Sequence, residues 1–125
     1  MAQPSIVAID DEIEFVKTIA QYFNSRGYTV HVALNGTSGI ELVRAQRPDV
    51  VLMDLKMPGI DGDVALTRIR EIDPKLPVVV ITAYSDEGDT RDRVLALGAF
   101  AYLEKPLSSV RHLAEVVEQA LASTA

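Results

Sequence analysis

Residues 50–54 of the chain have the sequence Val50-Val51-Leu52-Met53-Asp54. Four apolar residues in a row are typical of a short strand that is covered on both of its faces. A second run of this kind, Val78-Val79-Val80-Ile81, is followed by Thr82. Strands buried on both faces occur mostly in parallel sheets, where crossover helices connect one strand to the next. The fold therefore depends on what separates these runs.

Outward from these runs, strand and helix patterns alternate along the whole chain. Helical stripes of apolar residues end at glycine or proline, as at Gly27, Pro48 and Gly98. We expect strands at Ser5–Ile9, Tyr28–Leu34, Val50–Met53, Pro77–Thr82 and Ala101–Leu103, and helices at Glu12–Arg26, Thr37–Arg47, Asp63–Ile72, Asp86–Leu97 and Val110–Leu121. Right-handed crossovers then predict one doubly wound α/β domain over residues 1–125, with the strand order left open.

Composition narrows the class of protein. The chain has 125 residues, no cysteine and a net charge of -6. Disulfides and thiolate metal sites are therefore excluded, and direct binding of nucleic acid is not expected, because that affinity rests on neutralising phosphates. No apolar run approaches the length of a membrane span, and the N-terminus lacks the pattern of a signal peptide. We expect a cytoplasmic protein that does not enter the membrane.

Charged and polar residues follow four of the expected strands. They are Asp10, Asp11 and Glu12 after the first, Asp54 after the third, Thr82 at the end of the fourth and Lys105 after the fifth. In open α/β sheets the carboxyl ends of the strands form the ligand site. Carboxylates gathered there repel one another and raise each other's pKa, so a cation must compensate them. Magnesium, with its preference for oxygen ligands, and the ammonium of Lys105 would do so.

The first strand is not followed by a glycine-rich turn. The dinucleotide-binding fingerprint and the phosphate-binding P-loop are therefore both absent. The site looks unsuited to holding a nucleotide on backbone amides. It looks suited to a small anion that a metal ion bridges to the protein.

Four segments together resemble a response-regulator receiver domain. They are Ile6-Val7-Ala8-Ile9-Asp10-Asp11-Glu12, Asp54-Leu55-Lys56-Met57-Pro58-Gly59-Ile60-Asp61-Gly62, Ile81-Thr82-Ala83 and Tyr102-Leu103-Glu104-Lys105-Pro106. The resemblance covers essentially the whole chain. It implies a flavodoxin-like (βα)5 fold with a central five-stranded parallel sheet. It also implies a phosphorylation-activated switch of a two-component system or phosphorelay, not a turnover enzyme.

The resemblance gives roles to the acidic residues. Asp54 matches the phosphoacceptor, a carboxylate nucleophile that forms an acyl phosphate. Asp11 resembles the direct magnesium ligand, and Asp10 the acid that holds the metal mainly through water. The backbone carbonyl of Lys56 would complete the protein ligands. Magnesium is the implied cofactor, and manganese is expected to substitute for it.

Other positions match the switching residues of the family. Lys105 resembles the residue that pairs with Asp54 and then with a phosphoryl oxygen, and its bond to Pro106 is usually cis in this family. Thr82 resembles the hydroxyl that moves to the phosphoryl group, and Tyr102 the ring that turns inward with it. Phosphorylation would then alter the face formed by the fourth helix, fifth strand and fifth helix.

Two further residues are expected to set the lifetime of the phosphorylated state. Lys56 lies two residues after Asp54, and Tyr84 two residues after Thr82. In the family these positions flank the path of the hydrolytic water, so a long lysine and a bulky phenol predict slow autodephosphorylation. The polar segment Ser85–Arg93 contains Gly88, which lowers helix stability by about 1 kcal/mol relative to alanine, and we expect it to be mobile.

The implied partners are a histidine kinase or histidine phosphotransfer domain and a downstream effector that the sequence does not identify. We expect a monomer or a phosphorylation-dependent dimer.

One alternative is a haloacid-dehalogenase-type phosphatase, which needs a second aspartate where this chain has Lys56. Another is a pseudo-receiver that only binds partners, although such domains usually lose acidic or lysine positions that are present here. Whether the domain acts alone or within a longer protein stays open.

Overall fold

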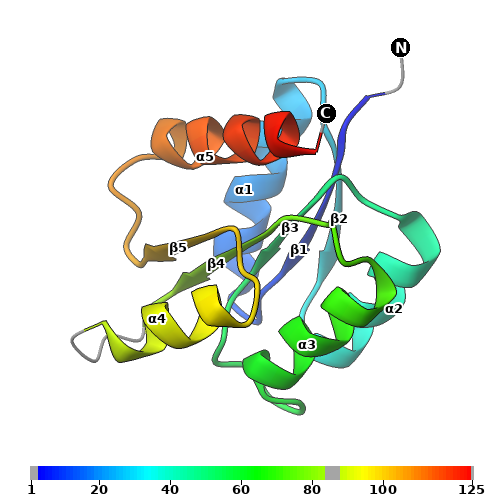
Figure 1. Cartoon of the computed structure of the whole chain (residues 1–125). Helices are drawn as coiled ribbons and strands as arrows, with labels where there is room; N and C mark the ends of the chain where they lie inside the picture. Colours follow the sequence, from blue (N-terminus) through cyan, green and yellow to red (C-terminus); the bar gives the residue numbers. More distant parts are fainter. Residues whose placement is uncertain (1–2, 84–87, 125) are drawn as a thin grey trace.

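A computed structural model of the chain describes residues 3–83 and 88–124. Five strands alternate with five helices, as the sequence predicts (Figure 1). The strands are β1 (Ser5–Ile9), β2 (Thr29–Ala33), β3 (Val50–Met53), β4 (Val78–Thr82) and β5 (Ala101–Glu104). The helices are α1 (Ile13–Ser25), α2 (Gly36–Gln46), α3 (Gly62–Ile72), α4 (Asp89–Ala96) and α5 (Val110–Ser123).

All five strands are parallel and lie in the order β2-β1-β3-β4-β5. This order, which the sequence left open, is that of a doubly wound flavodoxin-like sheet. The order reverses direction between β1 and β3, so the switch point lies where these two strands end. Helices α1 and α5 cover one face of the sheet, and α2, α3 and α4 cover the other (Figure 1).

The strands are apolar along their whole length because each face of the sheet has its own core. In β1, Ile6 and Ala8 pack with α1 and α5, whereas Val7 and Ile9 pack with the helices of the opposite face. Every residue of β3 and β4 is buried. Full burial of one such side chain stabilises the fold by about 1.5–3 kcal/mol. These central strands therefore provide a rigid base for the loops that follow them.

Side chains cap the N-termini of α2, α3 and α5, the last through Ser109, whose Oγ accepts a hydrogen bond from the His112 amide at 3.0 Å. The Asn35 side chain accepts a hydrogen bond from the Ser38 amide at 2.9 Å and caps α2. The Asp61 side chain accepts one from the Asp63 amide at 2.9 Å and caps α3. Such caps satisfy amide groups that the helix itself leaves unpaired.

The predicted start of the fourth helix is wrong. The helix begins at Asp89, because Gly88 has a φ of 93° and stands outside the helix as its N-cap. Residues 86 and 87 of the predicted helix lie outside the described residues. In α4 only Thr90 and Val94 are buried. The helix is thus attached to the core through these two residues alone.

In the described parts of the chain, none of the helices has the length and apolar character needed to cross a bilayer.

Gly62 is required where α3 passes close to the loop after β3. A Cβ atom at this position would lie 2.7 Å from Leu55 Cα and 2.8 Å from the Leu55 carbonyl oxygen. We expect Gly62→Ala to lower the free energy of unfolding in urea by about 1–3 kcal/mol, because backbone has to move to make room. Thr67→Ala, on the exposed face of the same helix, should change it by less than about 0.5 kcal/mol. Equal stability of the two variants would contradict this reading.

Candidate functional site

The ladder of the sheet brings the predicted site residues to one edge. The Asp10 amide donates to the Ala33 carbonyl at 3.0 Å, and the Asp54 amide to the Ile9 carbonyl at 3.0 Å. The Lys105 amide donates to the Thr82 carbonyl at 2.9 Å. Each site residue thus stands one step beyond the end of its strand and is held by the neighbouring strand.

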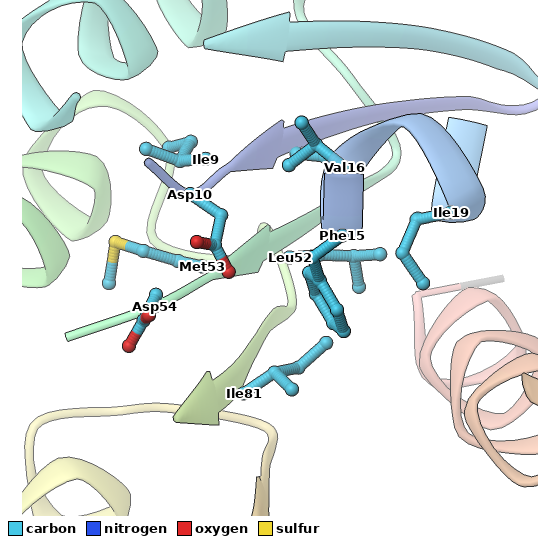
Figure 2. A pocket seen from close by; sticks show the side chains of 10 residues that line it. Ile9, Asp10, Phe15, Val16, Ile19, Leu52, Met53, Asp54 and Ile81 are labelled. Carbon is cyan, nitrogen blue, oxygen red and sulfur yellow. The ribbon is translucent and has the colours of Figure 1, made fainter. Parts of the chain in front are cut away.

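Asp10 and Asp54 are bound in the same way. One oxygen of each carboxylate accepts a hydrogen bond from the amide two residues later: Glu12 N to Asp10 Oδ1 at 2.9 Å, and Lys56 N to Asp54 Oδ1 at 3.2 Å. Both residues are buried, with 3% and 5% of their surface exposed. Figure 2 shows the two carboxylates beside each other at the ends of adjacent strands. The turns therefore fix both carboxylates before any ligand binds.

The second oxygen of each aspartate faces Lys105. Lys105 Nζ lies 2.7 Å from Asp10 Oδ2, 3.1 Å from Asp54 Oδ2 and 2.7 Å from Glu12 Oε1. The Lys105 side chain is only 9% exposed, whereas that of Glu12 is 60% exposed. One buried ammonium thus joins three carboxylates, and the group carries an excess of negative charge.

This geometry shifts two pKa values upward. Burial raises the pKa of Asp10 above its ordinary value, although hydrogen bonds from Lys105 and the Glu12 amide act in the opposite direction. Burial by itself would lower the pKa of Lys105, but its hydrogen bonds to Asp10, Glu12 and Asp54 outweigh burial and raise it. These shifts favour the protonated form of Lys105. Ionisation of the buried Asp10 carboxylate, by contrast, lowers the free energy of unfolding.

The donor set suits a hard cation. Asp10, Glu12 and Asp54 each offer a carboxylate oxygen, and these oxygens lie within 4.8 Å of one another. Oxygen ligands of this kind are those that magnesium prefers. Asp11 and Lys56 lie next to this group and line an open cleft on its solvent side. The sequence anticipated the acidic cluster, while Asp11 as direct ligand and the Lys56 carbonyl as ligand stay predictions.

Thr82 and Tyr102 lie on the side of the sheet that α4 covers. In the register of β4 and β5, Val80 pairs with Tyr102, and Thr82 is two residues farther along. Val80 and Tyr102 belong to the core on that face. Since alternate residues of a strand share a face, the Thr82 side chain is on the same side. Thr82 is fully buried and Tyr102 half-buried.

Two contacts of the site were not foreseen from the sequence. Glu12 follows the first strand, but no sequence pattern pairs it with Lys105, and Phe15 is simply one residue of an expected helix. The Phe15 ring lies under Lys105 Nζ, 4.4 Å from it to the ring centroid. The Lys105–Pro106 bond is cis, as predicted. Tyr84 lies outside the described residues, so its predicted position near the site is not tested.

Comparisons with known proteins agree on one family. The model of the family described as "Response regulator receiver domain" matches residues 6–118. Sporulation initiation phosphotransferase F of Bacillus subtilis (strain 168) is 36% identical over 106 residues, which are 85% of each chain. Regulatory protein AtoC of Escherichia coli (strain K12) is 37% identical over 116 residues, which are 93% of this chain but 25% of AtoC.

Solved structures give the same fold. A response regulator receiver domain protein (CheY-like) from Methanospirillum hungatei JF-1 has a TM-score of 0.89 at 22% identity, covering 98% of both chains. A response regulator receiver domain protein from Clostridium thermocellum has a TM-score of 0.84 at 30% identity, covering 97% of this chain and 96% of that one.

The raised pKa of Asp10 predicts how stability depends on pH. Because its folded-state pKa lies above the ordinary 3.8, the folded protein binds this proton more tightly than the unfolded chain, and stability falls as pH rises through that window. Asn resembles the protonated form, so Asp10→Asn should remove this loss. We expect the free energy of unfolding of Asp10→Asn, relative to wild type, to increase as pH rises above 3.8.

The measurement is urea unfolding of both proteins over a series of pH values in magnesium-free buffer. A difference in unfolding free energy that stays constant with pH, or that shrinks as pH rises, would contradict the assignment of Asp10 as an ionised carboxylate held at a cost.

Proposed function

This chain belongs to the response regulator receiver domain family, and we propose that it accepts a phosphoryl group on Asp54 and uses it as a conformational switch. Members of the family are the phosphoacceptors of two-component and phosphorelay signalling, and the chain is a signalling protein rather than a turnover enzyme. The observation that supports Asp54 most strongly is its place in the cluster. It is a buried carboxylate at the end of β3, 3.1 Å from the Lys105 ammonium.

The proposed reaction is an in-line transfer. A carboxylate oxygen of Asp54 attacks the phosphorus atom of a phosphohistidine, an O–P bond forms and the N–P bond to the donor breaks. The released imidazole of the donor takes up a proton. The turn after β3 holds Asp54 through the Lys56 amide, so the nucleophile is oriented before the donor arrives. Lys105 is placed to pair with an oxygen of the transferred group, whose charge spreads over those oxygens in the transition state.

Magnesium is the proposed cofactor, with manganese as a substitute. The residues proposed to hold it are Asp10, Asp11 and Asp54 with the backbone carbonyl of Lys56. When bound, the metal would neutralise negative charge on the transferring phosphoryl oxygens. The excess of carboxylates over ammonium groups in the cluster supports this proposal, because a second cation would offset the negative charge before an anion binds.

Thr82 and Tyr102 are proposed as the switch. The hydroxyl of Thr82 would donate a hydrogen bond to a phosphoryl oxygen. Tyr102, on the same face of the sheet, would turn inward as Thr82 moves. The adjoining helix α4 is held to the core through Thr90 and Val94. A helix with so few buried residues is easily shifted, so a small movement of Thr82 can change the population of states of the face made by α4, β5 and α5.

The proposed phosphodonor is a histidine kinase or a histidine phosphotransfer domain. We take residues 1–125 as one receiver domain, with a cytoplasmic location that the absence of cysteine favours. The alternative of a haloacid-dehalogenase-type phosphatase is disfavoured, because Lys56 replaces its second aspartate. The alternative of a pseudo-receiver is disfavoured by the complete set of carboxylates and by the placement of Lys105.

Incubation with acetyl phosphate and magnesium tests the central assignment. Intact mass spectrometry should show one added phosphoryl group on the wild type, and none without magnesium. Asp54→Asn should abolish the adduct. Asp61→Asn, in an exposed carboxylate of the neighbouring cleft, should retain it. An adduct that survives in Asp54→Asn would disprove Asp54 as the acceptor, and a wild type that is not modified by this donor or by a phosphohistidine protein would favour the pseudo-receiver.

Lys56 and Tyr84 are proposed to prolong the phosphorylated state. The Lys56 amide donates a hydrogen bond to Asp54, and Lys56 is an exposed residue that lines the open cleft together with Asp11. A long side chain two residues after the acceptor would shield the phosphoryl group from water without offering a general base. Tyr84 is included from its place in the sequence alone, since it lies outside the described residues.

We expect Lys56→Asn and Tyr84→Glu each to accelerate loss of phosphate from the isolated phosphoprotein by about tenfold, which corresponds to about 1.4 kcal/mol of barrier. Loss of phosphate over time is followed by intact mass after the donor is removed. Lys75→Asn, an exposed lysine in the turn between α3 and β4, controls for the change in net charge and should decay as the wild type does. Wild-type decay in the Lys56 variant would exclude the shielding role.

A further inference from the structure

Lys105 is nearer to the carboxylates beside α1 than to the proposed acceptor. Its Nζ atom lies 2.7 Å from Asp10 and from Glu12, but 3.1 Å from Asp54. Glu12 is the N-cap residue of α1, yet its side chain makes no capping hydrogen bond and extends to Lys105 instead. The N-terminus of α1 therefore uses its cap residue to hold the lysine.

Phe15 holds the same ammonium from the first turn of α1. Its ring centroid is 4.4 Å from Lys105 Nζ, a distance at which a cation is attracted to the face of an aromatic ring. Phe15 is partly buried against the core shared by α1 and α5, and it lines a cavity of about 10 Å³ with Asp10 and Asp54. Figure 2 shows the Phe15 ring extending from the start of α1 toward Ile81. Its position is thus set by packing.

We propose that Glu12 and Phe15 are positioning residues that hold the Lys105 ammonium at the N-terminus of α1. They would thereby compete for this ammonium with a phosphoryl group on Asp54. This inference rests on the proposed function and adds a regulation of the same site. The seat, defined as Glu12 Oε1 together with the Phe15 ring, holds the lysine in the resting protein. Phosphorylation succeeds to the extent that the phosphoryl oxygens draw the lysine away from it.

Charge gives the direction of the effect. Lys105 already forms ion pairs with three carboxylates, and a phosphoryl group on Asp54 would add negative charge that the same ammonium has to compensate. Glu12 is the one of the three whose side chain is mostly exposed, so its replacement by the isosteric glutamine removes one competitor without leaving a buried charge unpaired. Weakening the seat should therefore favour the phosphoryl-bound state.

Binding of beryllofluoride, an analogue of the phosphoryl group, measures this competition at saturating magnesium. We expect Glu12→Gln to lower the concentration for half-saturation about two- to fivefold, and Phe15→Leu to lower it about twofold, the sizes that one weakened ion pair and one cation–π contact allow. Glu14→Gln, which removes the same charge from the same turn but is not a partner of Lys105 among its described contacts, should bind as the wild type does. Phe15→Tyr keeps the ring and should restore wild-type binding.

The seat itself is tested without metal or donor. NMR of the resting protein should show the Lys105 Cε protons shifted upfield by the Phe15 ring, and the shift should vanish in Phe15→Leu and persist in Phe15→Tyr. Beryllofluoride should also reduce this shift in the wild type. Failure of the wild type to bind beryllofluoride would contradict the proposed function, whatever the state of the seat.

The inference on the seat is overturned by other results. If Glu12→Gln binds beryllofluoride no more tightly than Glu14→Gln, Glu12 does not compete for the lysine. If the Lys105 resonances do not respond to Phe15→Leu, or if they stay in place when beryllofluoride binds, the ring does not hold the ammonium in the resting state.

Discussion

A single buried ammonium, that of Lys105, shared by three carboxylates is the constraint on which the site depends. The carboxylates come from the turns after β1 and β3, and the lysine comes from the turn after β5, so no local segment could assemble them. The parallel sheet does so because β1, β3 and β5 end one residue before Asp10, Asp54 and Lys105, respectively. The apolar strands and the two cores that cover them therefore hold the Lys105 cluster in place.

The charge balance of this cluster explains why it responds to ligands. Burial of the Asp10 carboxylate opposes its ionisation and raises its pKa, and the neighbouring Asp54 carboxylate adds a smaller effect in the same direction. A divalent cation would offset the negative charge of the cluster, and a phosphoryl anion would then meet less repulsion there. We therefore propose an ordered response, in which the metal binds first, the phosphoryl group is added second and Lys105 moves third. Thr82 and the lightly anchored α4 then lie next to the atoms that change.

Most of the fold could be predicted because its signals are local. Fully apolar runs such as Val78–Ile81 and helix ends at Gly27 and Gly98 fix the elements, and strand ends fix where Asp54 and Lys105 must meet. The order of the strands could not be predicted, since it depends on how the helices pack across the sheet. The start of α4 was missed because Gly88 takes a left-handed conformation that composition does not reveal. The contacts of Glu12 and Phe15 with Lys105 join residues about ninety positions apart and have no sequence pattern.

The magnesium affinity of Lys105→Met, compared with that of the wild type, tests the central claim most directly. If Lys105 is the internal cation that compensates the three carboxylates, its removal means that the metal ion alone compensates their negative charge. The account then predicts magnesium binding that is tighter by about tenfold or more, measured by NMR titration of the folded protein at neutral pH. Unchanged or weaker binding would contradict it, because the carboxylates would then not depend on Lys105 for their compensation.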